Sequence, residues 1–247
     1  MPQSPSRQAF LLANEAARKA LELDNSLSEA HSARAMALAV ARRWSEAEPE
    51  FRRAIELNPN NATAHYFYAI AFLMPESQIK PAQEEFQIAL SLDPLSSIVN
   101  TNYATFLMVA HRYPESLAQF QKVLARDPNF PPLHYRVSQL YATMGRFAEA
   151  VREYQWGLPK PYSASADANG YREAILGNMS PEYPDTVSAA AVACAISGQR
   201  DQAFQYLEKA YAAGHRELLF VIRLPAFDPL RSDPRYADLM RRLGLPE

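Results

Sequence analysis

The sequence predicts an all-α fold made of stacked pairs of antiparallel helices. Three observations indicate it: a motif returns every 34 or 35 residues, prolines separate long stretches in which apolar residues have helical spacing, and glycine is scarce. The chain has 19 prolines and 7 glycines, and all the glycines lie from Gly145 onward. Because tight turns between strands need glycine more often than this, the punctuation favours helices.

The first element is a single helix predicted over residues 7–24. Its alanines, Ala13, Ala17 and Ala20, occupy the positions of the second helix in a pair. The first helix of that pair is missing from the sequence. We therefore expect the chain to be the carboxy-terminal part of a longer protein.

Four similar units follow between residues 28 and 157. Each has a small residue in its first helix, a small residue and an aromatic one in its second helix, and in three units a closing proline. The first-helix residues are Ala35, Ala69, Ala104 and Ser138. The second-helix pairs are Ala47 and Phe51, Ala82 and Phe86, Ser116 and Phe120, and Ala150 and Tyr154. Small residues let two helix backbones approach closely, so this register predicts tightly packed helix pairs.

Two interruptions break the regular spacing. The second unit has one extra residue, which we expect to bulge in the turn at residues 75–80 without breaking the stack. Residues 158–184 contain four prolines and two glycines and predict an irregular linker with one short helix near Tyr171–Leu176.

Regular pairing resumes with helices predicted at residues 185–197 and 200–213, joined at Gly198. The apolar stretch 218–222 and a last helix ending at Leu243 are expected to cover the open apolar end of the stack, because repeat arrays need a cap to stay soluble.

The sequence thus predicts three parts. Residues 1–157 form the first helix and four units, residues 158–184 the linker, and residues 185–247 a fifth helix pair with its cap.

The repeated motif resembles the tetratricopeptide repeat, whose 34-residue unit has small residues at its eighth and twentieth positions and proline near its end. The resemblance covers residues 28–157 and implies a right-handed α-α superhelix, a solenoid that holds partners. Pentatricopeptide arrays have a similar period, but they bind RNA and are expected to be basic. The tail after Phe227 resembles the ends of such repeat regions in large bacterial regulators, including serine/threonine kinases and winged-helix regulators, which implies a docking role beside an effector domain.

The resemblance also implies a concave groove lined by fixed positions of each first helix. Carried over residue by residue, the lining residues are Tyr66, Ile70, Leu73, Thr101, Asn102, Thr105, Met108, Tyr135, Arg136, Gln139 and Ala142. This surface is aromatic and apolar, with Asn102 and Arg136 as its polar anchors. The family's clamp for acidic C-termini needs lysine where Tyr66 and Tyr135 stand, so an apolar or amphipathic segment is favoured as the partner. Alternatively, the groove is filled by the chain's own tail or by another copy, and the chain serves self-association.

Composition and charge exclude several functions. Apolar residues make up 48% of the chain. The net charge is -2, so the chain has no overall positive charge that would attract nucleic acid or anionic lipid. Cys194 is the single cysteine, which rules out an intrachain disulfide. No stretch approaches the roughly 18 apolar residues of a membrane-spanning helix. We expect a soluble protein, cytoplasmic in preference, or periplasmic if it comes from a membrane-anchored regulator.

Three histidines occupy the fourth position of their units: His31, His65 and His134, with Asn100 in the remaining unit. Neighbouring helices pack about 10 Å apart, whereas zinc needs ligand bonds of about 2 Å, so structural imidazoles are favoured over a metal site. Phosphate-binding loops and nucleophile elbows are absent from the sequence, and Cys194 is expected to be buried. We expect no enzyme activity, cofactor or metal.

Overall fold

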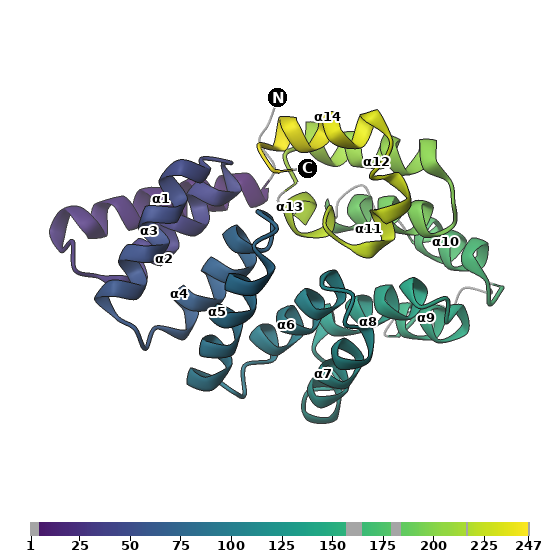
Figure 1. Cartoon of the computed structure of the whole chain (residues 1–247), viewed down its shortest axis with the longest axis horizontal. Helices are drawn as coiled ribbons and strands as arrows, with labels where there is room; N and C mark the ends of the chain where they lie inside the picture. Colours follow the sequence, from purple (N-terminus) through teal and green to yellow (C-terminus); the bar gives the residue numbers. More distant parts are fainter. Residues whose placement is uncertain (1–4, 157–164, 179–183, 216, 247) are drawn as a thin grey trace. The chain divides into compact units, whose positions relative to one another are not determined.

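The computed structural model describes residues 5–156, 165–178, 184–215 and 217–246, and within these ranges every regular element is a helix (Figure 1). The predicted all-α fold is therefore confirmed. The helices of the first part are α1 (Pro5–Leu23), α2 (Ser28–Val40), α3 (Trp44–Leu57), α4 (Ala62–Tyr68) continuing into the π-helix η1 (Ala69–Leu73), and α5 (Ile79–Leu92). They are followed by α6 (Ser97–Val109), α7 (Tyr113–Arg126), α8 (Pro131–Thr143), α9 (Phe147–Tyr154) and α10 (Ala168–Gly177). The remaining helices are α11 (Pro184–Ile196), α12 (Arg200–Ala212), α13 (Glu217–Val221), the 3-10 helix η2 (Pro225–Leu230) and α14 (Pro234–Leu243).

The chain divides into two compact units, and each is described by itself. Unit 1 comprises Met1–Val99 and Met240–Glu247, and unit 2 comprises Asn100–Leu239. The three-part division predicted at residues 157 and 184 stays a prediction, and residues 158–164 and 179–183 of the expected linker lie outside the described ranges.

Helices pair in unit 1 through the small residues of the repeated motif. Ala35 of α2 and Ala47 of α3 are fully buried, as is Phe51 one turn further along α3. Ser28 at the start of α2 donates its hydroxyl to the carbonyl oxygen of Ala54 at 2.8 Å. The methyl-sized side chains bring the helices close, and the phenylalanine fills the space between them.

The extra residue of the second repeat lies inside a helix and not in the turn. In the first repeat the small residue Ala35 precedes the left-handed turn residue Arg42 by seven positions, whereas in the second repeat Ala69 precedes Ser77 by eight. The N–H of Met74 donates to the carbonyl of Ala69, five residues earlier, at 2.9 Å. A single inserted residue is commonly absorbed in this way by one π-turn. The bulge predicted at residues 75–80 is thus wrong in its place.

The turn between the two helices of a pair is the same in the four repeats and in the fifth helix pair. In each, an N–H donates to the carbonyl five residues earlier at 2.8–2.9 Å, and the residue before the donor has a positive φ. The donor and acceptor residues are Arg43 and Leu38, Gln78 and Leu73, Arg112 and Leu107, Arg146 and Tyr141, and Gln199 and Cys194. This is the hydrogen-bond pattern of a helix C-cap with a left-handed residue.

Helix α10 is part of the core of unit 2. Tyr171 and Ile175 of α10 pack in one buried cluster with Ala150 of α9 and Ala189 of α11. The short helix expected at residues 171–176 lies within α10. The residues of this segment therefore join two successive helix pairs through apolar contacts.

The start of α10 leaves no space for a side chain at Gly170. Its N–H donates to the carboxylate of Asp167 at 2.7 Å, and a Cβ atom at this position would lie 2.0 Å from the carbonyl oxygen of Ser165. We expect Gly170→Ala to lower the free energy of unfolding by about 1–3 kcal/mol, because the Ser165 backbone must shift. Urea denaturation measures the loss, with Glu173→Ala on the exposed face of the same helix as the control. Unchanged stability of the alanine variant would show that the Ser165 segment moves aside at little cost.

The last helix pair of unit 2 is covered by the segments that follow it. Residues 189–195 of α11 are all buried, and both α13 and η2 pack against this helix. The hydroxyl of Tyr236 donates to the carbonyl of Ile222 at 2.9 Å and ties α14 to the residues after α13. In unit 1, Trp44 Nε1 donates to the carbonyl of Leu243 at 3.2 Å.

Candidate functional site

The residues predicted to line a groove differ in exposure. Seven of the eleven are buried: Ile70, Leu73, Thr101, Thr105, Met108, Gln139 and Ala142. The other four are partly exposed: Tyr66, Asn102, Tyr135 and Arg136. Tyr66, Ile70 and Leu73 belong to unit 1 and the rest to unit 2, so the two sets are described separately.

In unit 1, Tyr66 lies among aromatic rings. Its ring centroid is 5.2 Å from that of Phe67 and 6.4 Å from that of the buried Phe86. Ile70 and Leu73, in the π-turn that follows, are 6% and 1% exposed. Tyr66 is thus the member of this set that offers side-chain surface to a partner.

In unit 2, a buried amide holds two partly exposed residues of α8. Gln139 is 1% exposed; its Nε2 donates to the hydroxyl oxygen of Tyr135 at 2.7 Å, and its Oε1 accepts from Nη1 of Arg136 at 3.1 Å. The guanidinium carbon of Arg136 lies 5.6 Å from the centroid of the Tyr135 ring. The two side chains are therefore positioned together, with a flat aromatic face beside a positive charge.

Ala142 contacts the chain's own core. It packs in the buried cluster with Ala189 and Ala193 of α11, and Tyr135 packs against the edge of the same cluster. The arrival of α11 beside α8 explains this burial, which the spacing of the repeats alone does not reveal.

The three histidines at the fourth positions of their repeats, which we call the histidine ladder, are held by the same contacts. Each Nδ1 lies 2.5–2.8 Å from a glutamate of the second helix, and each Nε2 lies 2.7–3.0 Å from a carbonyl oxygen six residues earlier. The histidine, glutamate and carbonyl residues are His31, Glu50 and Asn25; His65, Glu85 and Pro59; and His134, Glu153 and Pro128. Among the described residues, no group of three or more His, Cys, Asp or Glu side chains could hold a metal ion.

Sequence reasoning missed the glutamates of this ladder. They follow their histidines by 19 or 20 residues, and in the third repeat Gln119 takes the same place and donates to Oδ1 of Asn100 at 2.6 Å. The sequence did contain a signal for this pairing. Each repeat with histidine at its fourth position has glutamate at the facing position of its second helix, and the repeat with asparagine there has glutamine.

Cys194 is buried, as expected from its place on α11. Burial raises the pKa of its thiol, and its Sγ lies 3.7 Å from Oε1 of Gln202. A buried thiol with a raised pKa is a poor nucleophile.

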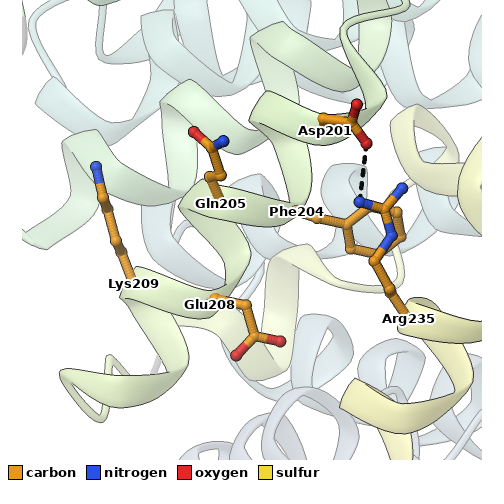
Figure 2. Close-up of a pocket in the computed structure, with 6 residues that line it drawn as sticks. All are labelled: Asp201, Phe204, Gln205, Glu208, Lys209 and Arg235. Atoms are coloured by element: carbon orange, nitrogen blue, oxygen red, sulfur yellow. Dashed lines mark hydrogen bonds and ion pairs between the residues drawn. The ribbon is translucent and has the colours of Figure 1, made fainter.

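A shallow depression of about 640 Å³ lies between α12 and α14 in unit 2 (Figure 2). Arg235 lies over the ring of Phe204 at 4.1 Å and binds Asp201 at 2.9 Å. Hydrogen bonds from Arg235 also lower the pKa of Asp233 to about 2. Figure 2 shows that the polar ends of Gln205, Glu208 and Lys209 do not converge on a common point. The depression therefore lacks the convergent polar groups of a small-molecule site.

Stacked helix pairs with small contact residues and a partly exposed set of side chains define a helical-repeat scaffold. Two family models, each described as "Tetratricopeptide repeat", match residues 28–61 and 104–169. The chain contains tetratricopeptide repeats, the type of scaffold through which proteins bind one another and which is typically not catalytic.

Relatives of known name match parts of the chain. Type IV pilus assembly protein PilF of Pseudomonas aeruginosa is 34% identical over 88 residues, which is 35% of this chain and 33% of the relative. Protein O-mannosyl-transferase Tmtc2 of Drosophila melanogaster is 39% identical over 70 residues, which is 28% of this chain and 8% of the relative. The chain thus spans a third or less of these relatives' length. Neither relative supports the expected resemblance to kinase or winged-helix regulators.

Solved structures show the same fold at low sequence identity. A tetratricopeptide repeat protein from Parabacteroides merdae has a TM-score of 0.59 at 16% identity, over 87% of this chain and 78% of that one. The type IV pilus biogenesis factor PilW has a TM-score of 0.52 at 22% identity, over 87% and 91%. Within the described ranges, no helix has both the length and the apolar character needed to cross a membrane.

Proposed function

We propose that this chain is a non-catalytic scaffold that docks an apolar or amphipathic segment of a protein partner on the first helices of its repeats. In unit 2 the contact residues are Asn102, Tyr135 and Arg136, and in unit 1 the contact residue is Tyr66. The observation that supports this most is the pair formed by Tyr135 and Arg136, which a fully buried glutamine holds in place. A preorganised aromatic and arginine pair is the kind of anchor that carries most of the binding energy at protein interfaces.

The charges of the first helices favour this partner chemistry. Helix α6 has no charged residue, and Arg136 is the one arginine of α8, which has no lysine or acidic residue. One cation suffices to bind a carbonyl or a single carboxylate, whereas a clamp for an acidic C-terminus needs several. An apolar segment with one acceptor beside it fits this surface better than a strongly acidic one or a nucleic acid.

We also propose that the scaffold is part of a larger bacterial regulatory protein, as the resemblance of the tail after Phe227 implies. The alternative proposal is self-association, in which the tail or a second copy occupies the same surface. Light scattering over a range of concentrations distinguishes the two: a monomer at every concentration that still binds a partner segment argues against self-association.

The docking surface is tested with a library of tiled peptides bound to the purified protein. We expect the wild type to select apolar or amphipathic peptides, and Tyr135→Ala to weaken their binding about thirtyfold or more, because truncation of an interface hot spot costs at least about 2 kcal/mol. The measurement is the dissociation constant by fluorescence anisotropy. Gln121→Ala, on the exposed face of α7, is the matched control and should bind as the wild type does. Equal affinities for Tyr135→Ala and the control, with the helical circular dichroism unchanged, would contradict the assignment.

A further inference from the structure

The contacts of the three ladder histidines call for more hydrogen-bond donors than a neutral imidazole has. A neutral imidazole has one N–H donor and one acceptor nitrogen, whereas an imidazolium has two donors. In His31, His65 and His134 both ring nitrogens lie within 3.0 Å of oxygens that only accept: a carboxylate and a backbone carbonyl. Only the protonated ring satisfies both contacts.

We propose that His65 acts as a pH-sensitive clamp between α4 and α5, closed when the ring is protonated and weakened when it loses the proton. In the third repeat the corresponding positions hold a neutral pair, in which Gln119 donates to Asn100. The second repeat should therefore respond to pH through this contact, and the third should not. This inference does not depend on the docking surface.

Burial and hydrogen bonding act in opposite directions on the pKa of His65. Burial acts to lower the pKa of its ring, but the hydrogen bonds that the ring donates to Glu85 and to the Pro59 carbonyl outweigh it, so that the pKa is raised overall. Glu85 of α5 is the charge that acts on the ring. Tyr68, one turn along α4, has its pKa raised to about 12, first by burial, and stays neutral throughout the range of interest.

The other two histidines differ in their surroundings. Glu50 binds both His31 and Arg34, whose Nη1 lies 3.0 Å from the second carboxylate oxygen. Within the described residues, Glu85 forms an ion pair with His65 only. In the fourth repeat the ring of Trp156 stacks on His134 at 3.7 Å. Loss of the proton from His65 should leave Glu85 without an ion-pair partner among the described residues and weaken the second repeat.

The sign of the effect follows from the raised pKa of His65. The folded protein holds the proton more tightly than the unfolded chain, so the stabilisation is complete below the unfolded pKa, near 6.5. It is lost as pH rises through the folded pKa. The second repeat should be more stable at pH 6 than at pH 8.5.

Native-state hydrogen exchange tests this repeat by repeat. After correction for intrinsic exchange rates, we expect the protection factors of α4 and α5 to fall several-fold between pH 6 and pH 8.5, and those of α6 and α7 to change much less. The double variant His65→Asn with Glu85→Gln copies the neutral pair of the third repeat and should remove the pH dependence from α4 and α5. The reciprocal variant Asn100→His with Gln119→Glu should introduce it into α6 and α7.

A titration of the wild-type imidazole resonances by NMR keeps the proposal testable even if a variant fails to fold. We expect the ring of His65 to be charged at pH 6.5 and to titrate above the value of the unfolded chain. A neutral His65 ring at pH 6 would overturn the proposal, as would the same loss of protection in the double variant as in the wild type.

Discussion

Replacing Phe120 with alanine is expected to lower the free energy of unfolding of unit 2 by about 3–5 kcal/mol, the usual cost of removing a large buried aromatic side chain. Phe120 is fully buried on α7, and so are the first-helix residue Ala104 and the second-helix residue Ser116. The hydroxyl of Ser116 donates to the Ala104 carbonyl at 2.7 Å. Because this bond fixes the distance between the two helices, they cannot move together to fill the cavity. Urea denaturation followed by circular dichroism measures the loss.

The control for Phe120 is its exposed neighbour Gln121. Gln121→Ala should change the free energy of unfolding by less than about 0.5 kcal/mol, as surface substitutions usually do. A loss below about 1 kcal/mol in Phe120→Ala would mean that the two helices collapse onto the cavity, against the packing described above.

The second large effect is expected at Tyr171. Its ring is 1% exposed and lies in the core shared by α9, α10 and α11. Tyr171→Ala should cost about 3–5 kcal/mol and release α10 from its neighbours. Hydrogen exchange should then increase in α10 and in the facing residues of α11, while urea denaturation reports the loss for unit 2.

Tyr171→Phe separates packing from hydrogen bonding. It keeps the ring and removes the hydroxyl, which lies near the side chain of Ser138, so a loss of at most about 1 kcal/mol is expected. If Tyr171→Ala were no more costly than Tyr171→Phe, α10 would be a loosely attached linker helix and not part of the core.

The register of small and aromatic residues predicted most of the fold. Ala35, Ala47 and Phe51 are buried where the repeat places them, because the helix period fixes which residues face the partner helix. The turn at Gly198 and the helices on either side of it also follow from local sequence. These features depend on contacts close along the chain, which a repeat pattern encodes directly.

The candidate site was less predictable because it depends on distant contacts. The repeat pattern assigns Ala142 and Tyr135 to the same surface, but the core with α11 buries the first and leaves the second partly exposed. The role of Gln139 depends on two side chains of its own helix adopting particular rotamers. The spacing of residues in the sequence does not determine either.

The π-turn at Ala69–Leu73 has a consequence for how such an array tolerates changes in length. One residue added to a regular α-helix rotates everything after it by about 100° about the helix axis. The widened turn takes up that rotation locally, so Leu73 reaches the following turn in the same phase as Leu38 does in the first repeat. The insertion of one residue is thus confined to a single helix, and the turn that follows it keeps the geometry of the turn in the first repeat.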